Sequence, residues 1–191
     1  MALKTWRYFR TFSTEEDQFL IPDNVQGQHN EIAHRISPTN LGLLLNSQYA
    51  AHDLGFITLP RFLMEANRSF LHAKNLPRVN GHFLNWYDTR SSTPLPPFFI
   101  SSVDSGNLVC SLLTLKQGCL AAVAQPILAE SLFHSLRDYL AMAAEELAVL
   151  AGQTDSLAAV EPRAPSAIPM SDAVRTGASL TPSPTKATGR L

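Results

Sequence analysis

Apolar side chains recur at helical spacing in five segments of the chain, with polar stretches between them. These segments are residues 3–12, 38–55, 59–76, about 104–115 and 127–152. Ser37-Pro38 introduces the second segment, because serine caps helix N-termini and proline is favoured at the first helical position. Pro77 ends the third segment, and Gly152 is predicted to end the fifth. The pattern predicts an all-α fold.

Two long loops and a proline-rich tail complete the chain. The loops cover residues 13–40 and 80–108, and their apolar and aromatic residues favour ordered, functional segments. Residues 153–191 hold five of the chain's 13 prolines and no aromatic residue, so this tail is predicted to be disordered. The predicted organisation is one domain over residues 1–152 and a tail over residues 153–191.

Composition narrows the classes of partner. Hydrophobic residues make up 45% of the chain and charged residues 16%, which leaves open either a sparsely charged soluble domain or a surface that expects a partner. The net charge of −1 gives no electrostatic basis for binding nucleic acid or an anionic membrane. No uninterrupted apolar run reaches the roughly 18 residues of a membrane span, so no span is expected. The N-terminal residues lack the apolar core of a signal peptide.

The two cysteines and six histidines predict no metal site. If Cys110 and Cys119 lie on one helix, about 13 Å separates them, so they cannot form a disulfide. We interpret them as core thiols of a protein in a reducing compartment. No cofactor motif is present.

The segment "FLNWYDTR" combines the residue types of a sugar site. Sugar binding needs flat aromatic faces together with carboxylates and amides that pair with hydroxyl groups. The segment supplies them as Asn85, Trp86, Tyr87, Asp88 and Arg90. The alternative is a hairpin whose aromatic residues fill the core and whose aspartate caps a turn.

Three further polar segments carry the same ambiguity. "SSVDSGNL" contains Ser101 to Asp104, which either form a helix N-cap or present the Asp104 carboxylate to a ligand at the helix start. "AHRISPTNLG" places Arg35 at the mouth of a helix, where it either holds a carboxylate of the site in a bidentate pair or lies in a surface loop. The acidic run "STEEDQ" at residues 13–18 is predicted to be a solvated face or a first-turn charge set.

These segments occur in an order and at a spacing that resemble a known family. "TWRYFRTFSTEEDQFLIPDNVQ", "AHRISPTNLGLLLNSQYAAHDLGFI", "NGHFLNWYDTR" and "FISSVDSGNL" are similar to the start of the glucoamylase-like region of cyclic β-1,2-glucan synthases. Those synthases are large proteins of the bacterial inner membrane. The resemblance covers about residues 4–120, and it places this chain, which lacks the membrane segments, in the cytoplasm.

The resemblance implies a partial (α/α)6 toroid of helical hairpins with its cleft at the helix N-termini. In the family this region is a retaining transglycosylase that closes linear β-1,2-glucan into rings. The implied glucan-binding or site-shaping residues are Arg35, Thr39, Asn40, Asn85, Trp86, Tyr87, Asp88, Asp104, Ser105 and Asn107. Asp88 and Asp104 are the best candidates for contacts with sugar hydroxyls.

The chain departs from the family in its helix count and its tail. Five helices are too few for a complete toroid, and the family's catalytic glutamates lie downstream, so no catalytic residue is assigned. We expect the N-terminal fragment of such a domain, produced by a frame change, a truncation or a gene-model break. It would bind glucan weakly and be inactive alone. Two alternatives are a short glycoside hydrolase using Asp88 and Asp104, and a non-catalytic module that docks on a helical protein through its uncovered edges.

Overall fold

The computed structural model describes residues 1–26 and 31–158, and this part of the chain is mostly helical. Its helices are α1 (Ala2–Phe12), α2 (Pro38–Asp53), α3 (Leu59–Asn75), α4 (Ser102–Val123) and α5 (Glu130–Ala158). The high helical content is compatible with the predicted all-α class. The chain divides into a unit of residues Met1–Leu150 and a unit of residues Ala151–Leu191. The fold below is that of the first unit.

Short strands, which the sequence pattern did not indicate, lie within or directly before the two predicted loops. They are β1 (Val25–Gln26), β2 (Glu31–Ile32), β3 (Arg35–Ile36), β4 (Arg78–Val79), β5 (His82–Phe83) and β6 (Tyr87–Asp88). They form three antiparallel pairs, β1 with β2, β3 with β6 and β4 with β5. In the β3–β6 pair Arg35 lies opposite Asp88, so the two long loops are joined to each other.

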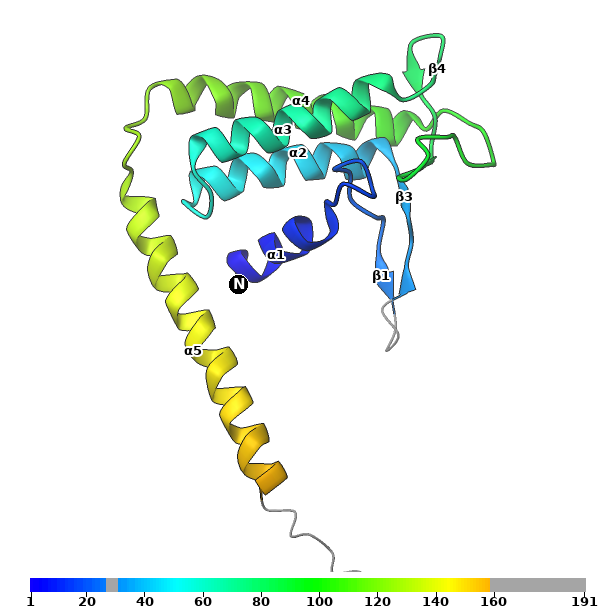
Figure 1. Cartoon of the computed structure of the whole chain (residues 1–191). Helices are drawn as coiled ribbons and strands as arrows, with labels where there is room; N and C mark the ends of the chain where they lie inside the picture. Colours follow the sequence, from blue (N-terminus) through cyan, green and yellow to red (C-terminus); the bar gives the residue numbers. More distant parts are fainter. Residues whose placement is uncertain (27–30, 159–191) are drawn as a thin grey trace, which may run out of the picture. The chain divides into compact units, whose positions relative to one another are not determined.

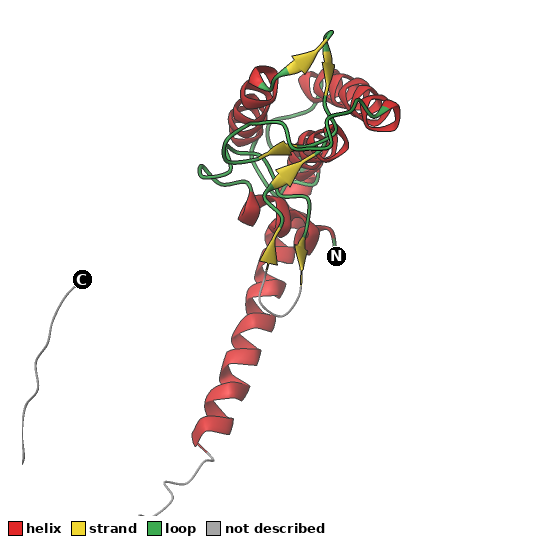
Figure 2. Ribbon diagram, turned by 90° about the vertical axis from the view of Figure 1, so that its right-hand side faces the viewer, coloured by secondary structure: helices red, strands yellow, loops and turns green. Residues whose placement is uncertain are grey.

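Helices α2, α3 and α4 lie side by side, with the strands and loops gathered at one end (Figure 1). Figure 2 looks onto that end. Helix α3 returns antiparallel to α2, because His52 near the end of α2 stacks on Phe62 near the start of α3, while Leu41 near the start of α2 shares the core with Ala73 near the end of α3. Helix α4 runs parallel to α2, because Thr39 and Asp104 meet near their N-termini while Tyr49 meets Gly118 near their C-termini. Parallel α2 and α4 therefore bring two helix starts together.

The main core lies between α2 and the loops. It contains buried residues of every segment that meets there: Leu20, Ile21, Ile36, Leu41, Leu44, Leu45, Ala73, Leu76, Leu84, Tyr87 and Leu108. A second cluster joins Leu3 and Trp6 of α1 to Ala51 of α2, with Tyr139 of α5 against it. Trp6 thus packs the first helix against α2.

Two predicted helix properties need correction. Helix α5 continues past Gly152 to Ala158, so glycine does not end it. Of the tail that was predicted to be disordered, residues 159–191 lie outside the residues that the structure describes. Cys110 and Cys119 both lie on α4 and are free, but Cys110 is exposed, so it is not a core thiol.

Helix α4 carries a largely uncovered apolar surface. Val109, Leu113 and Leu120 are each more than half exposed, and only Leu108 of α4 is fully buried. Within residues 1–26 and 31–158, α4 is the one helix that is long and apolar enough to cross a membrane by length and composition. Serine, threonine and glutamine interrupt the apolar residues of α4, so the sequence shows no uninterrupted apolar run there. Packed helices of soluble proteins can have the same length and apolar composition, and α4 packs against α2.

The approach of α2 to α4 is close enough that a single added carbon clashes. A Cβ at Gly42 would lie 2.6 Å from the Ser111 Oγ and 2.7 Å from its Cβ, and rotation of the serine side chain cannot move the Cβ. We expect Gly42→Ala to lower the free energy of unfolding by about 1–3 kcal/mol through forced separation of the helices. Urea denaturation followed by circular dichroism measures this change.

Gly106→Ala is the matched control, because a Cβ there meets no atom within 4 Å. The same replacement should raise stability by about 1 kcal/mol through helix propensity alone. Equal stability of the Gly42→Ala and Gly106→Ala proteins would show that the two helices are not in such close contact.

Candidate functional site

The first turns of α2 and α4 are both capped, and both face the same cluster of loops. Ser37 and Asn40 form a capping box at α2, in which each side chain accepts the other residue's backbone N–H. Ser101 caps α4 by accepting the backbone N–H of Asp104 at 3.1 Å. Helix starts carry partial positive charge and favour an anionic or oxygen-rich partner. The predicted cap at Ser101 is therefore real, and it leaves the Asp104 side chain available for other contacts.

The Asp104 carboxylate joins the two helix starts to the second loop. Its Oδ1 accepts from the Thr39 hydroxyl at 2.5 Å, and Thr39 in turn accepts from the Asn107 amide at 3.1 Å. In the amide orientation that satisfies its neighbours, Asn85 donates to the Asp104 Oδ2 at 3.1 Å. Two motifs that the sequence analysis treated separately, "FLNWYDTR" and "SSVDSGNL", thus meet at one carboxylate.

Trp86 is held in place on two sides. In the same amide orientation its indole Nε1 donates to the Asn85 side-chain oxygen at 2.5 Å. The Arg35 guanidinium carbon lies 4.5 Å from the Trp86 ring centroid, a cation–π contact. Arg35 donates through Nε and Nη2 to one oxygen of Asp23, at 3.2 and 3.0 Å. Asn40 also donates to Asp23, at 3.5 Å.

These contacts form a connected set that we call the helix-end network. Its members are Asp23, Arg35, Thr39, Asn40, Asn85, Trp86, Asp104 and Asn107. Arg35 does hold a carboxylate, as one of the sequence alternatives proposed. The partner, Asp23, was missed because it lies in a loop without periodicity and outside the segment read around Arg35.

Two predicted site residues, Tyr87 and Ser105, form hydrogen bonds outside the helix-end network. Tyr87 is 1% exposed, and its hydroxyl donates to the Pro77 carbonyl and accepts from the Leu84 N–H, both at 2.7 Å. Burial raises the pKa of Tyr87, so its hydroxyl stays protonated. Ser105 donates to the Ser101 carbonyl at 2.8 Å within the first turn of α4. Tyr87 and Ser105 therefore shape the site.

Asp88 forms a local turn. Its Oδ1 accepts from the backbone N–H groups of Arg90 and Ser91 at 3.0 and 2.7 Å, and from the Ser91 hydroxyl at 2.9 Å. This is the turn-capping role that the sequence analysis set beside sugar binding. Although burial raises its pKa, the hydrogen bonds from Ser91 and Arg90 and the Arg90 charge outweigh that effect and lower the pKa of Asp88.

The buried carboxylate of Asp17 lies outside the network and holds the residues that flank the β3–β6 pair. Asp17 is 5% exposed and accepts from the Thr89 hydroxyl at 2.5 Å, and its Oδ1 lies 2.8 Å from the His34 Nδ1. The prediction of a solvated acidic run is therefore wrong for Asp17, although Glu15 and Glu16 are exposed. His34 and Thr89 flank the β3–β6 pair, so their bonds to Asp17 fix the strand that carries Arg35.

Exposed aromatic rings lie beside the network in a segment that the sequence analysis did not single out. Phe98 is 66% exposed and Phe99 is 46% exposed. The Phe99 carbonyl accepts the Asn85 N–H at 2.9 Å, and the Leu95 N–H bonds to the Trp86 carbonyl at the same distance. The run "PLPPFF" was a usable signal, because consecutive aromatic residues in a proline-rich loop have no helix or strand face to occupy.

Metal ligation finds no geometric support in the part of the chain that the structure describes. No group of three or more His, Cys, Asp or Glu side chains lies close enough together there to hold an ion. The chemistry open to the helix-end network is hydrogen bonding by a carboxylate, amides and a hydroxyl next to aromatic rings.

No protein-family profile matches the sequence. Over 120 residues, 62% of its length, the chain is 39% identical to cyclic beta-(1,2)-glucan synthase NdvB of Rhizobium meliloti (strain 1021). The chain spans 4% of that protein's length. The resemblance inferred from the four sequence segments is confirmed, and the chain is related to a region of the cyclic β-(1,2)-glucan synthase family.

Proposed function

We propose that the helix-end network forms one wall of a β-1,2-glucan-binding cleft within a larger (α/α)6 toroid. The observation that carries this proposal is the meeting of Asn85 with Asp104, which brings two polar segments onto one surface at paired helix starts. The relationship to a cyclic β-(1,2)-glucan synthase supplies the substrate class. The chain would contribute the first helical pairs of the domain.

The network has free capacity for sugar hydroxyls. An ionised carboxylate offers about four lone-pair sites, of which Asp104 uses two on Thr39 and Asn85. Asn107 is exposed and has amide groups beyond its one bond to Thr39. Phe98 and Phe99 offer the flat apolar faces against which a sugar ring packs. Arg35 occupies one face of Trp86, so the exposed phenylalanines are the stronger stacking candidates.

The helical arrangement supports the toroid. Helices α2 and α4 are parallel, and α3, which lies between them in sequence, is antiparallel to α2. This alternation is expected of successive helical hairpins, in which every second helix belongs to the same layer. The exposed apolar residues of α4 fit a face covered by further helices of the same domain. The alternative of a module that docks on a separate helical protein uses the same face.

Hydrolysis by Asp88 and Asp104 has little support. A glycosidase needs one carboxylic acid with a raised pKa as the proton donor and a second carboxylate placed across the bond. The pKa of Asp88 is lowered, and its carboxylate caps a turn. We therefore propose that this chain binds glucan without turning it over. The free thiols Cys110 and Cys119 fit the reducing cytoplasm as its location.

Replacement of Phe98 tests the binding surface. Phe98→Ala should weaken binding of linear β-1,2-glucan about tenfold through loss of the ring contact, without loss of stability, because the side chain is 66% exposed. Trp86→Ala should also weaken binding, because the indole N–H holds the Asn85 amide in its orientation toward Asp104. Titration calorimetry on the purified chain gives the affinities, and mass analysis of the glucan should show neither rings nor shortened chains.

Phe133→Ala on α5 is the matched control, because Phe133 is 71% exposed and belongs to a different surface. It should bind like the unmodified chain. Equal loss of affinity in the Phe98 and Phe133 variants would count against the proposed wall, as would ring formation that disappears in Asp104→Asn.

The lowered pKa of Asp88 predicts a pH dependence of stability. Because the folded pKa lies below the unfolded value of about 3.9, Asp88 contributes stability above that value and loses it as the pH falls through the folded pKa. Carbon-13 NMR of the side-chain carboxyls should show Asp88 titrating below the range of an ordinary aspartate. Ser91→Ala should move the titration upward, and an unchanged midpoint would contradict the role of the Ser91 hydroxyl.

A further inference from the structure

A groove lies between α3 and α4, and the β4–β5 hairpin borders it where α3 ends (Figure 1). Its volume is about 390 Å³, within the range of roughly 300–1,000 Å³ that is usual for small-molecule sites. Most of its lining is apolar and comes from three helices and the hairpin: Leu41 and Leu45 of α2, Phe70 and Ala73 of α3, Leu108 and Leu112 of α4, and Phe83 of β5. We call it the α3–α4 groove.

The α3–α4 groove has the length of a small molecule and is too short for a docked helix. It takes one turn from each helix, since its lining spans residues 41–45, 70–74 and 108–112, about 6 Å along each axis. A docked helix needs apolar anchors over two or more turns. The exposed α4 residues Val109, Leu113 and Leu120 are not in the lining, so the groove is separate from the face that further helices would cover.

Two cationic side chains complete the lining. Lys74 lies in the last turn of α3, and Arg78 follows four residues later in β4. Neither forms an ion pair within residues 1–26 and 31–158. The Arg78 guanidinium carbon lies 4.3 Å from the Phe83 ring centroid, which holds this charge against a wall of the groove. Stacking through one face leaves the N–H donors at the guanidinium edge available to an oxyanion.

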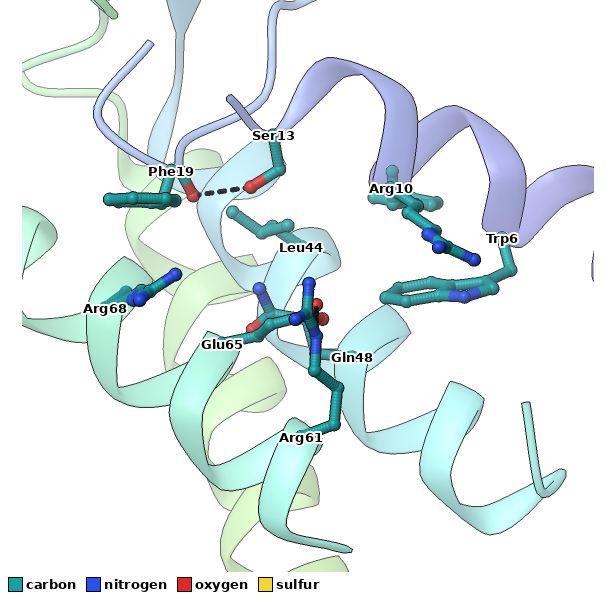
Figure 3. A pocket seen from close by; sticks show the side chains of 10 residues that line it. Trp6, Arg10, Ser13, Phe19, Leu44, Gln48, Arg61, Glu65 and Arg68 are labelled. Carbon is teal, nitrogen blue, oxygen red and sulfur yellow. Dashed lines mark hydrogen bonds and ion pairs between the residues drawn. The ribbon is translucent and has the colours of Figure 1, made fainter. Parts of the chain in front are cut away.

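A second cavity, between α1, α2 and α3, has a different character (Figure 3). Its volume is about 70 Å³, and the charged side chains of Arg10, Glu65 and Arg68 are among its walls. It has room for water and no continuous apolar surface. Of these two cavities, the α3–α4 groove is the one that combines apolar walls with a cationic end.

We propose that the α3–α4 groove binds a fatty acid. The hydrocarbon chain lies against the leucine and phenylalanine side chains, where it leaves water, and the carboxylate lies at Lys74 and Arg78. The Arg78 guanidinium can bind both carboxylate oxygens, and the flexible Lys74 side chain adds a second positive charge. The groove shares no residue with the helix-end network, so fatty-acid binding is a property separate from the proposed binding of glucan.

Calorimetric titration of the full chain at neutral pH tests the ligand class. The probes are decanoate, octanoate, decyl phosphate and decyltrimethylammonium, each below the concentration at which it forms micelles. Decanoate should bind with one molecule per chain, and octanoate should bind about tenfold more weakly because it lacks two methylene groups. Absence of decanoate binding, or equal binding of decyltrimethylammonium, would overturn the proposal. Tighter binding of decyl phosphate than of decanoate would overturn the assigned head group.

Three exposed side chains separate the site from general adsorption of the probe. Lys74→Gln and Arg78→Gln should leave the fold intact, because both side chains are exposed, and each should weaken decanoate binding about fivefold. Lys116→Gln is the matched control, since this exposed lysine of α4 is outside the lining, and its variant should bind like the unmodified chain. Equal affinities of the Lys74→Gln and Lys116→Gln proteins would overturn the proposal.

The outcome is independent of the glucan experiment. Phe98→Ala, which tests the proposed glucan wall, should leave decanoate binding unchanged because Phe98 does not line the groove. A loss of decanoate binding in Phe98→Ala would place the fatty acid elsewhere and overturn the assigned site.

Discussion

The close contact of α2 with α4 is the constraint on which the rest of the structure depends. Gly42 and Gly118 are the positions where a side chain would meet the opposite helix. Their hydrogen side chains let two parallel helices approach until their first turns share a hydrogen bond between Thr39 and Asp104. Any wider spacing would separate the helix starts, and the loops that cross them would lose their common anchor.

The geometry of the helix ends explains why one carboxylate serves both fold and site. Asp104 lies in the first turn of α4, where the helix dipole favours a negative charge. Its side chain is also the point that Thr39 and Asn85 approach from two other segments. A ligand hydroxyl would meet a carboxylate already fixed in direction, so little side-chain entropy remains to be lost on binding.

Helix starts were the most predictable part of the fold. Ser37 and Ser101 both cap helices, because capping depends on a few neighbouring residues that the sequence displays directly. The end of α5 was not predictable from Gly152, since a glycine inside a helix costs only about 1 kcal/mol. The strands escaped prediction because each contains two residues, too few to show alternation.

The site was predictable in its residue types and less so in its contacts. The sequence marked Asn85 and Asp104 but could not show that they meet, because the contact depends on the packing of α4 on α2. Asp17 and Asp23 were missed for a related reason. Both lie in an irregular loop, where only tertiary structure decides whether a carboxylate is solvated or buried.

The bond between Asp17 and Thr89 also bears on the order in which the site assembles. The two residues are 72 positions apart, and the intervening chain contains all of α2 and α3. Closing so long a loop carries an entropy cost that grows with the logarithm of its length and that one hydrogen bond cannot offset. Contacts of such high sequence separation are slow to form in folding. The α2–α3 hairpin, whose contacts are local, shortens the effective loop, so we expect the polar end of this domain to complete its structure after its helical body.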